Sequence, residues 1–485
     1  MSGDRLRRLW TDPEQRRWLA FAALAATYGL VSIYRLSTAV LADELTRAFS
    51  VTGTQLGTLH ASFFYVYAAM QLPAGVLADR LGSRRTVTAG ALVMSLGGLA
   101  FAAADSYALA FVGRALVGLG GSVLFVAILR FSANWFRPTE FARMNGITIA
   151  VAGVGGILAT TPLAVAVAVA GWRETVAALS LVGVALAVGA YLVARDSPSA
   201  AGFDPIADVD TPGSPSLRGV ISNARRVLGE LETWLCGAVL FAGTGVNLTV
   251  IGLWGIPYLV ESYGLSVTVA STYTLLASVG LLVGPPATGF VSDRLAARRS
   301  VRRSDRRPER RSDRRSGGRS EGSTATTRGI GSAGGERSGA DAAMTASRTR
   351  LVVWGMAVYT VAFGALAATG VPPLFVVAVV FLASGVLTGT FVLTYAVVKE
   401  RHDATASGVS TGTINMMAFS GAAVLPTLMG YALDAYWTGE TVGGVRVYSE
   451  FGYQVAFGIA TAIAFLSLLA AMWLHRRTVR ATDAS

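Results

Sequence analysis

The sequence is poor in the residues that build disulfide frameworks and metal centres. It contains one cysteine, Cys236, and three histidines, His60, His402 and His475, which lie far apart in the chain. A single cysteine excludes a disulfide framework and a cysteine-based zinc site, and the scattered histidines argue against another metal centre. No nucleophile–base constellation or phosphate-cradling loop is present, so we expect neither an enzyme nor a bound cofactor.

Acidic residues are missing from the apolar stretches. With 53% hydrophobic residues and a mean hydropathy of +0.52, the chain of 485 residues is too apolar for a soluble globule. Its apolar runs approach the length of about 20 residues that a helix needs to cross a bilayer. No Asp or Glu lies well inside one of these runs. A site for cations, or for protons on a buried carboxylate, would normally contain such an acid, so the absence favours an anionic ligand.

The net charge of +12 is concentrated in one segment. Residues 291–350 hold 16 Arg and 7 Asp or Glu, and therefore nine of the twelve net positive charges. Because the positive charge is concentrated in this one segment, it argues against a nucleic-acid partner. Within it, residues 300–349 are low-complexity Arg, Ser and Gly, which predicts disorder. The alternative is a polybasic patch held on anionic lipid headgroups.

The apolar runs predict an all-α polytopic membrane protein with twelve transmembrane helices in two pseudo-symmetric six-helix bundles. The predicted divisions are an N-terminal segment 1–17, a first bundle 18–193, a linker 194–231, a second bundle 232–474 with the insertion 300–349, and a C-terminal segment 475–485.

The distribution of bases predicts the orientation. If residues 1–17 are cytoplasmic, 36 of the 41 Lys and Arg fall on the cytoplasmic side, and only Arg47, Arg173 and Arg446 fall outside. This asymmetry satisfies the positive-inside rule with both termini cytoplasmic. Because residues 1–17 are not followed by a small-residue cleavage site, we expect an uncleaved multi-pass protein of the cell membrane.

Two similar loops connect apolar runs in the two halves. The first is Gly75–Arg85, with the sequence GVLADRLGSRR, and the second is Gly289–Arg299, with the sequence GFVSDRLAARR. A tight, cationic, glycine-bearing connection is typical of a cytoplasmic loop. The first loop resembles the G-x-L-A-D-R-x-G-R-R signature of the major facilitator superfamily and departs from it only at Ser83. The resemblance implies that superfamily's fold and secondary transport by alternating access.

The resemblance also implies gating roles. Asp79 is expected to dock near the start of helix 11, at Asp403–Ser407, and Asp293 near Glu140–Asn145 of helix 5. Arg114 opens a segment similar to the superfamily's span-4 signature, with a structural pairing role and a coupling role both open. The full set of predicted gating residues is Gly75, Asp79, Arg80, Gly82, Arg84, Arg85, Arg114, Gly289, Asp293 and Arg294.

Shorter segments resemble the organic-anion and sugar-phosphate permease branch. They are Tyr34-Arg35, residues 134–140, residues 171–173 and residues 195–198. Phosphate-ester exchangers of that branch pair an arginine in span 1 with a second in span 7, and span 7 here has none. This difference favours a monoanion or carboxylate over a dianionic phosphate ester.

Arg35 is the strongest candidate for a substrate ligand. A charge at the centre of a membrane helix costs about 2.5–3.5 kcal/mol, and a guanidinium can hold a carboxylate or phosphate through two hydrogen bonds. Tyr28, Ser32 and Thr38 share its helical face, which indicates a polar stripe toward a cavity. The alternative is that Arg35 reaches lipid headgroups.

Two further stripes predict cavity-lining residues. Span 2 contributes His60, Phe64 and Tyr67, and span 7 contributes Asn247, Trp254 and Tyr258, with Tyr395 and Asn415 as additional candidates. Ordinary packing is the alternative for each aromatic residue, and His60 is also a candidate proton relay.

The sequence therefore predicts a monomeric transporter of a small organic anion, coupled to protons or to an exchanged anion. Two other functions stay open: a drug or metabolite exporter of the same fold, and a membrane ligand sensor that signals through its cytoplasmic loops.

Overall fold

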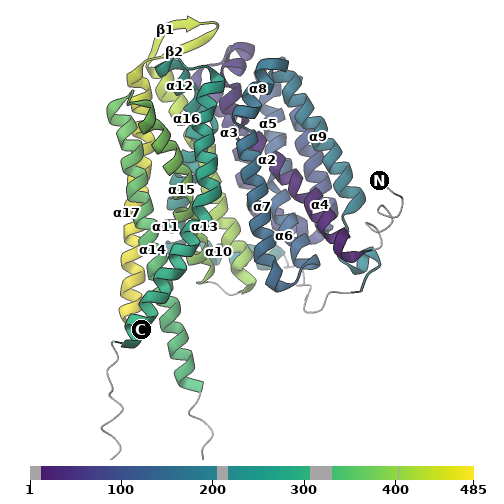
Figure 1. The fold of residues 1–485 in the computed structure, drawn as a ribbon, viewed down its shortest axis with the longest axis vertical. Helices are drawn as coiled ribbons and strands as arrows, with labels where there is room; N and C mark the ends of the chain where they lie inside the picture. The colour runs from purple at the N-terminus through teal and green to yellow at the C-terminus, as the bar shows by residue number, and fades with distance from the viewer. Residues whose placement is uncertain (1–11, 205–216, 306–329, 402–403, 485) are drawn as a thin grey trace, which may run out of the picture.

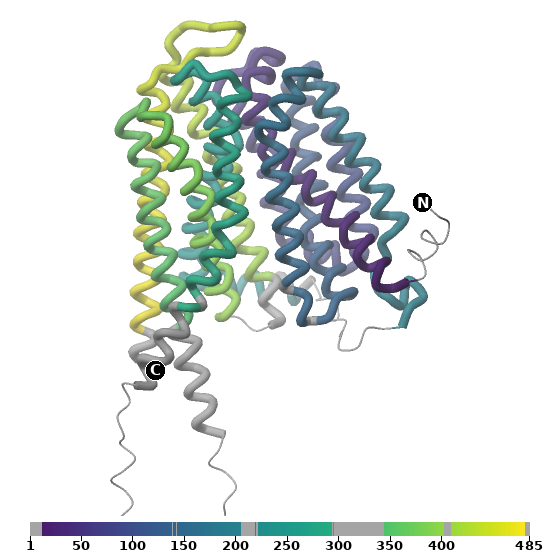
Figure 2. Tube along the Cα trace, in the orientation of Figure 1, coloured from purple at the N-terminus to yellow at the C-terminus, as the bar shows by residue number. Residues whose placement is uncertain are grey.

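The chain folds into two bundles of long helices that lie side by side (Figure 1). The structure, a computed structural model, describes residues 12–204, 217–305, 330–401 and 404–484. Each bundle is built from one continuous part of the chain, the first drawn in purple to blue and the second in teal through green to yellow (Figure 2). The predicted all-helical membrane architecture in two bundles is confirmed.

The first bundle begins where Asp12 caps a long helix: its carboxylate accepts a hydrogen bond from the Glu14 amide at 2.9 Å, and Pro13 occupies the first helical position. The bundle contains α2 (Pro13–Phe49), α3 (Gly53–Ala69), α4 (Gln71–Ala102), α5 (Tyr107–Ser122), α6 (Leu124–Trp135), α7 (Pro138–Leu158), α8 (Thr161–Ala170) and α9 (Trp172–Val193).

A linker with the short 3₁₀ turn η1 (Ser199–Ala201) and helix α10 (Leu217–Leu228) leads to the second bundle. This bundle contains α11 (Leu231–Thr249), the π-helical turn η2 (Val250–Trp254), α12 (Gly255–Tyr263), α13 (Val267–Asp305), α14 (Ile330–Thr369), α15 (Leu374–Lys399), α16 (Ala404–Ala435), strands β1 (Trp437–Val442) and β2 (Val445–Tyr448), and α17 (Glu450–Ala484).

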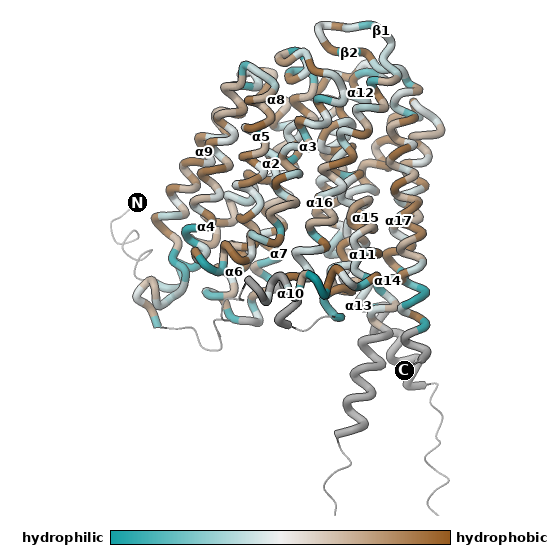
Figure 3. Tube along the Cα trace, turned by 180° about the vertical axis from the view of Figure 1, so that it is seen from behind, coloured by the Kyte–Doolittle hydropathy of each residue, from teal (hydrophilic) through white to brown (hydrophobic). Residues whose placement is uncertain are grey.

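Eleven helical segments within the described residues are long and apolar enough to cross a membrane. Helix α3, with 17 residues, is too short to be counted among these segments. Met70 between α3 and α4 has helical dihedral angles, so the first pass continues from α3 into the start of α4. Helix α4 then bends at Gly82, where φ is +79°, and returns. Together α3 and α4 thus supply two passes. Apolar residues cover the lengths of the helices, and hydrophilic residues gather at their ends (Figure 3).

The structure adds two elements that the sequence reading missed. Helix α10 lies inside the predicted linker 194–231, and the antiparallel hairpin β1–β2 connects α16 to α17. At the ends of the predicted disordered insertion, residues 300–305 and 330–349 are helical, because α13 and α14 extend beyond their apolar parts. An existing helix lengthens at little cost once it is nucleated. Residues 306–329 lie outside the described part of the chain.

The two ends of the molecule differ. We call the end that carries strands β1 and β2 the hairpin end, and the end with the first turn of α2 and the last turns of α17 the termini end (Figure 1). At the hairpin end, α3 of the first bundle packs directly on α16 of the second. A Cβ atom added at Gly57 would lie 2.2 Å from the Pro426 carbonyl oxygen, and one at Gly430 would lie 2.2 Å from the Gly53 oxygen. Glycine at these positions therefore allows the two backbones to touch.

Candidate functional site

Arg35 of α2 lies at the interface between the bundles. Its Nη2 donates to the Tyr67 hydroxyl of α3 at 3.2 Å, and its guanidinium lies 5.2 Å from the ring centres of both Tyr67 and Phe419 of α16. Its Nε is buried without a hydrogen-bond partner. No ion pair among the described residues includes Arg35. Only aromatic faces and hydroxyl groups therefore compensate its charge.

A chain of hydrogen bonds crosses from the first bundle to the second beside Arg35. Gln71 of α4 donates to the Tyr67 carbonyl at 2.9 Å, and Asn415 of α16 donates to the Gln71 side-chain oxygen. The Tyr395 hydroxyl of α15 in turn donates to Asn415 at 2.6 Å. Buried polar groups that are fully paired in this way specify one arrangement of their helices. The chain thus joins the two bundles at the level of the arginine.

Five of the predicted substrate ligands come together here: Arg35, Tyr67, Tyr395, Asn415 and Tyr28, which lies close enough to act electrostatically on Arg35 and Tyr67. Gln71 and Phe419 also belong to this cluster and were not among the ligands predicted from the sequence. Phe419 follows Asn415 by four residues, so helical spacing places the two on one face of α16.

A second buried polar site, His60 with Arg114, lies in the first bundle. The His60 side chain is fully buried, and neither ring nitrogen has a hydrogen-bond partner. The Leu248 backbone lies beside the ring without hydrogen-bond geometry. Arg114 of α5 is 2% exposed and lies 5.6 Å from the Phe101 ring centre, near enough for its charge to act on His60. Among the described residues, no acid forms an ion pair with Arg114.

The remaining predicted ligands of the first bundle are engaged in packing. Ser32 lies against α7, because a Cβ atom added at Gly155 would lie 3.0 Å from the Ser32 Cβ. The Thr38 hydroxyl is buried without a partner, and the Phe64 ring lies near the His60 ring, with the centres 5.2 Å apart.

The three predicted ligands of span 7 donate their hydrogen bonds to the backbone. Asn247 donates to the Ser384 carbonyl at 3.2 Å and Trp254 to the Pro426 carbonyl at 3.2 Å. Tyr258 donates to the Gly370 carbonyl at 2.6 Å. The structure thus does not bring them into the cluster around Arg35.

The first signature loop is fastened to its own bundle. The Arg84 amide donates to the Asp196 carboxylate at 2.8 Å, and Asn134 and Trp135 donate to the carbonyls of Asp196 and Arg195 at 2.9 and 2.8 Å. The Arg84 guanidinium lies 3.9 Å from the Tyr191 ring centre. Segments 134–140 and 195–198, both of which resemble the anion-permease branch, therefore come together beside this loop.

The structure also describes several of the other predicted gating residues. Asp79 pairs with Arg130 of α6, and Arg294 lies 3.9 Å from the Phe290 ring centre. Arg80 and Arg85 are exposed, and Cβ atoms added at Gly75 and Gly289 would meet no atom within 4 Å. The Asp403–Ser407 side chains, the expected partners of Asp79, and the Asp293 side chain lie outside the described part of the structure.

Two bundles of membrane-length helices, with a partly buried arginine at the interface between them, are the architecture of a membrane transport protein. The chain belongs to the Major Facilitator Superfamily, whose family model matches residues 18–304. Over 96% of this chain and 98% of the other, the fold matches a bacterial homologue of the human lysosomal transporter Spinster in an inward-facing, unoccupied conformation, with a TM-score of 0.70 and 16% sequence identity.

Two curated relatives each match a little over half of the chain. "Probable sulfoacetate transporter SauU" of Cupriavidus necator is 26% identical over 58% of this chain and 66% of its own length. "Hexuronate transporter" of Bacillus subtilis is 28% identical over 57% of this chain and 64% of its own length. The chain thus matches a little under two thirds of the length of these relatives.

Proposed function

We propose that the protein is a secondary active transporter that carries a small organic anion across the cell membrane by alternating access, with Arg35 as the anchor of the anion. The observation that carries this proposal is the Arg35 guanidinium at the interface between the bundles. It is held by the Tyr67 hydroxyl and the rings of Tyr67 and Phe419, and by no carboxylate among the described residues.

A buried cation without a counter-charge is costly unless a ligand supplies one. A carboxylate or sulfonate would accept two hydrogen bonds from the guanidinium and neutralise it. Arg114 adds a second positive charge without an acid partner among the described residues. The substrates named for the two relatives, sulfoacetate and hexuronate, both carry acid groups.

The donors of span 7 support a substrate with one anchored acid group. Asn247 and Trp254, two of the candidate ligands of span 7, which has no arginine, already donate to backbone carbonyls. The positive-inside rule places the termini end in the cytoplasm and the hairpin end outside. The transporter is a monomer in this proposal and is driven by protons or by an exchanged anion.

The test is uptake into proteoliposomes of carboxylates and sulfonates, beginning with glucuronate and sulfoacetate, by the wild type and Arg35→Gln. Removing the guanidinium removes the charge-assisted hydrogen bonds, each worth about 1.5–3 kcal/mol. We expect uptake of the transported anion to fall by at least tenfold. Uptake that follows an imposed pH gradient, or that requires a preloaded anion, identifies the driving force.

Arg47→Gln is the matched control, because it makes the same change on α2 at a solvent-exposed arginine that pairs with Glu44. We expect this variant to keep most of its uptake. If Arg35→Gln transports every accumulated anion as well as the wild type does, the anion site is wrong. Transport of neutral or cationic apolar compounds, unaffected by Arg35→Gln, would support the exporter function instead.

A further inference from the structure

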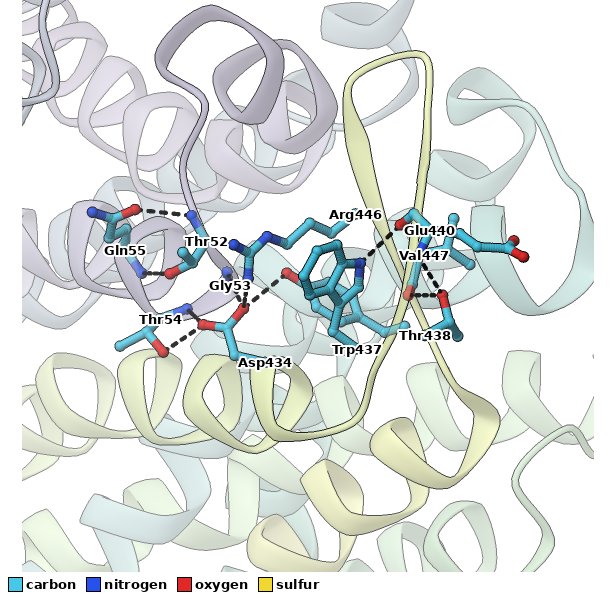
Figure 4. Close-up of polar contacts among 11 residues, drawn as sticks. Thr52, Gly53, Thr54, Gln55, Asp434, Trp437, Thr438, Glu440, Arg446 and Val447 are labelled. Atoms are coloured by element: carbon cyan, nitrogen blue, oxygen red, sulfur yellow. Dashed lines mark hydrogen bonds and ion pairs between the residues drawn. The ribbon is translucent and has the colours of Figure 1, made fainter.

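One carboxylate of the second bundle binds the first turn of a helix in the first bundle. Asp434, near the end of α16, accepts hydrogen bonds from the Gly53 and Thr54 amides, each at 2.8 Å (Figure 4). It also accepts one from the Thr54 hydroxyl at 2.6 Å. These residues begin α3, so Asp434 joins the two bundles at the hairpin end.

The first turn of α3 has two backbone amides that are free to donate to Asp434. Thr52 and Gln55 form a capping box: the Thr52 hydroxyl accepts from the Gln55 amide at 3.2 Å, and the Gln55 side chain accepts from the Thr52 amide at 2.9 Å. The Gly53 and Thr54 amides remain, because the first four amides of a helix have no partner within it. Asp434 takes both, and its negative charge also suits the positive end of the helix dipole.

The hairpin holds Asp434 in place from the other side. Arg446 of β2 pairs with the same carboxylate at 3.2 Å, and the Tyr448 hydroxyl donates to it at 3.4 Å. The hairpin itself turns tightly at Gly443 and Gly444, which both have positive φ. Its strand β2 is anchored to α12 through the Tyr448 amide, which donates to Glu261 at 3.0 Å.

The partners of Asp434 thus divide between the bundles. Gly53 and Thr54 belong to the first bundle, whereas Arg446 and Tyr448 belong to the second, as Asp434 itself does. If the bundles separate at the hairpin end, Asp434 keeps Arg446 beside it, and the α3 amides and the Thr54 hydroxyl bond to water instead. A contact of this kind can break and re-form without leaving a buried, unpaired charge, which would be costly.

We propose that Asp434, together with Gly53, Thr54, Arg446 and Tyr448, is a reversible closure of the hairpin end, and that breaking it is required for the protein to open there. The proposal concerns the conformational cycle and does not depend on which substrate is carried. Its test therefore uses access to a thiol and needs no transport.

The test variant is Asp434→Asn. An asparagine has one side-chain oxygen, so it can accept from only one of the two α3 amides and presents an N–H to the other. The native thiol is first removed by Cys236→Ser, since Cys236 is the only cysteine. Thr58→Cys then serves as reporter, because the Thr58 hydroxyl lies 3.2 Å from the Thr427 hydroxyl of α16, one helical turn below the closure.

The reporter protein is placed in lipid nanodiscs and labelled with a maleimide, and labelling is followed by mass. We expect Asp434→Asn to label at least fivefold faster than the parent. Glu440→Gln is the matched control: it neutralises a carboxylate on the exposed strand β1 whose side chain forms no hydrogen bond or ion pair with the described residues of the first bundle. This control should label at the parent rate.

A second reporter separates opening from loss of structure. Gly75→Cys lies at the other end of the interface, where its Cβ position is open. If the proposed alternating access holds, Asp434→Asn should lower the labelling rate at Gly75→Cys, whereas local unfolding would raise the labelling rate at both reporter positions.

If Asp434→Asn does not fold, Thr54→Val replaces it, because this variant removes only the hydrogen bond of the Thr54 hydroxyl. We then expect a twofold rise in the labelling rate of Thr58→Cys. An unchanged Thr58→Cys rate in a folded variant, or an equal rise in Glu440→Gln, would overturn the proposal.

Discussion

At the scale of single residues, the signature loop depends on Gly82. Its dihedral angles, φ +79° and ψ 166°, lie in a region that only glycine adopts without strain. An added Cβ atom would also lie 2.6 Å from the Asp196 carboxylate, the acceptor for the Arg84 amide. The second glycine of the signature is therefore required by backbone geometry and by the close approach of the linker.

We expect Gly82→Ala to lower the free energy of unfolding by about 1–3 kcal/mol, the usual cost of such a backbone conformation for a residue with a side chain. Thermal unfolding in detergent measures the loss. Gly75→Ala is the control in the same loop, because its Cβ would meet no atom within 4 Å and alanine favours a helix. Equal melting temperatures for the two variants would show that the Gly82 conformation is not required.

The site residues were predictable from the sequence only in part. Arg35 and Tyr67 could be identified because a charge and a mixed polar stripe are unusual in an apolar helix. Their connection to Asn415 and Tyr395 follows from how the two bundles pack, which helical periodicity within one span does not contain. Trp254 and Tyr258 have the same kind of pattern, yet they donate to backbone carbonyls. A polar and aromatic stripe therefore predicts which face of a helix is buried, but it does not predict whether that face contacts a ligand or another helix.

At the scale of elements, the contact between α3 and α16 depends on small residues at matched spacing. Gly53 and Gly57 are four residues apart in α3, and Pro426 and Gly430 are four apart in α16. Residues at this spacing share a helical face, and small side chains there let membrane helices approach until their backbones touch. The obstacle to a larger side chain is the partner's backbone, which cannot rotate away as a side chain can.

We therefore expect Gly57→Ala to destabilise the protein by about 1–3 kcal/mol, as overpacking typically does. The measurement is again the thermal unfolding curve. Gly458→Ala in α17 is the control, because a Cβ atom there would meet nothing within 4 Å. A Gly57→Ala protein as stable as Gly458→Ala would mean that α3 and α16 separate easily.

The elements themselves were largely predictable, because long apolar runs have one structural solution in a bilayer. The hairpin was missed, although Gly443-Gly444 between two alternating segments is a known hairpin signal, because its strands are short and lie between two dominant apolar runs. Helix α10 was missed inside a polar linker. The π-helical turn Val250–Trp254 was also not predicted, because an apolar helical run does not distinguish a single π turn from α-helix.

At the scale of the whole molecule, the two bundles are joined at two levels along their interface. The Asp434 cluster and the glycine contacts lie at the hairpin end, and the chain from Gln71 through Asn415 to Tyr395 lies beside Arg35. A transporter that works by alternating access must release the first level to admit a ligand from that side while the bundles themselves stay intact. The proposed cycle can therefore be tested by holding the contact at the hairpin end closed.

A disulfide across the hairpin end should stop this cycle. Thr58 and Thr427 have hydroxyl oxygens 3.2 Å apart on facing helices, so sulfur atoms in their places need only a small shift to reach the bond length of about 2.05 Å. In the Cys236→Ser background, we expect oxidised Thr58→Cys/Thr427→Cys to lose uptake and a reductant to restore it, because the bond holds the end shut. Each single cysteine variant, treated with the same oxidant, should keep its uptake. Full uptake by the cross-linked protein would mean that transport proceeds without separation of α3 from α16, which would exclude alternating access at the hairpin end.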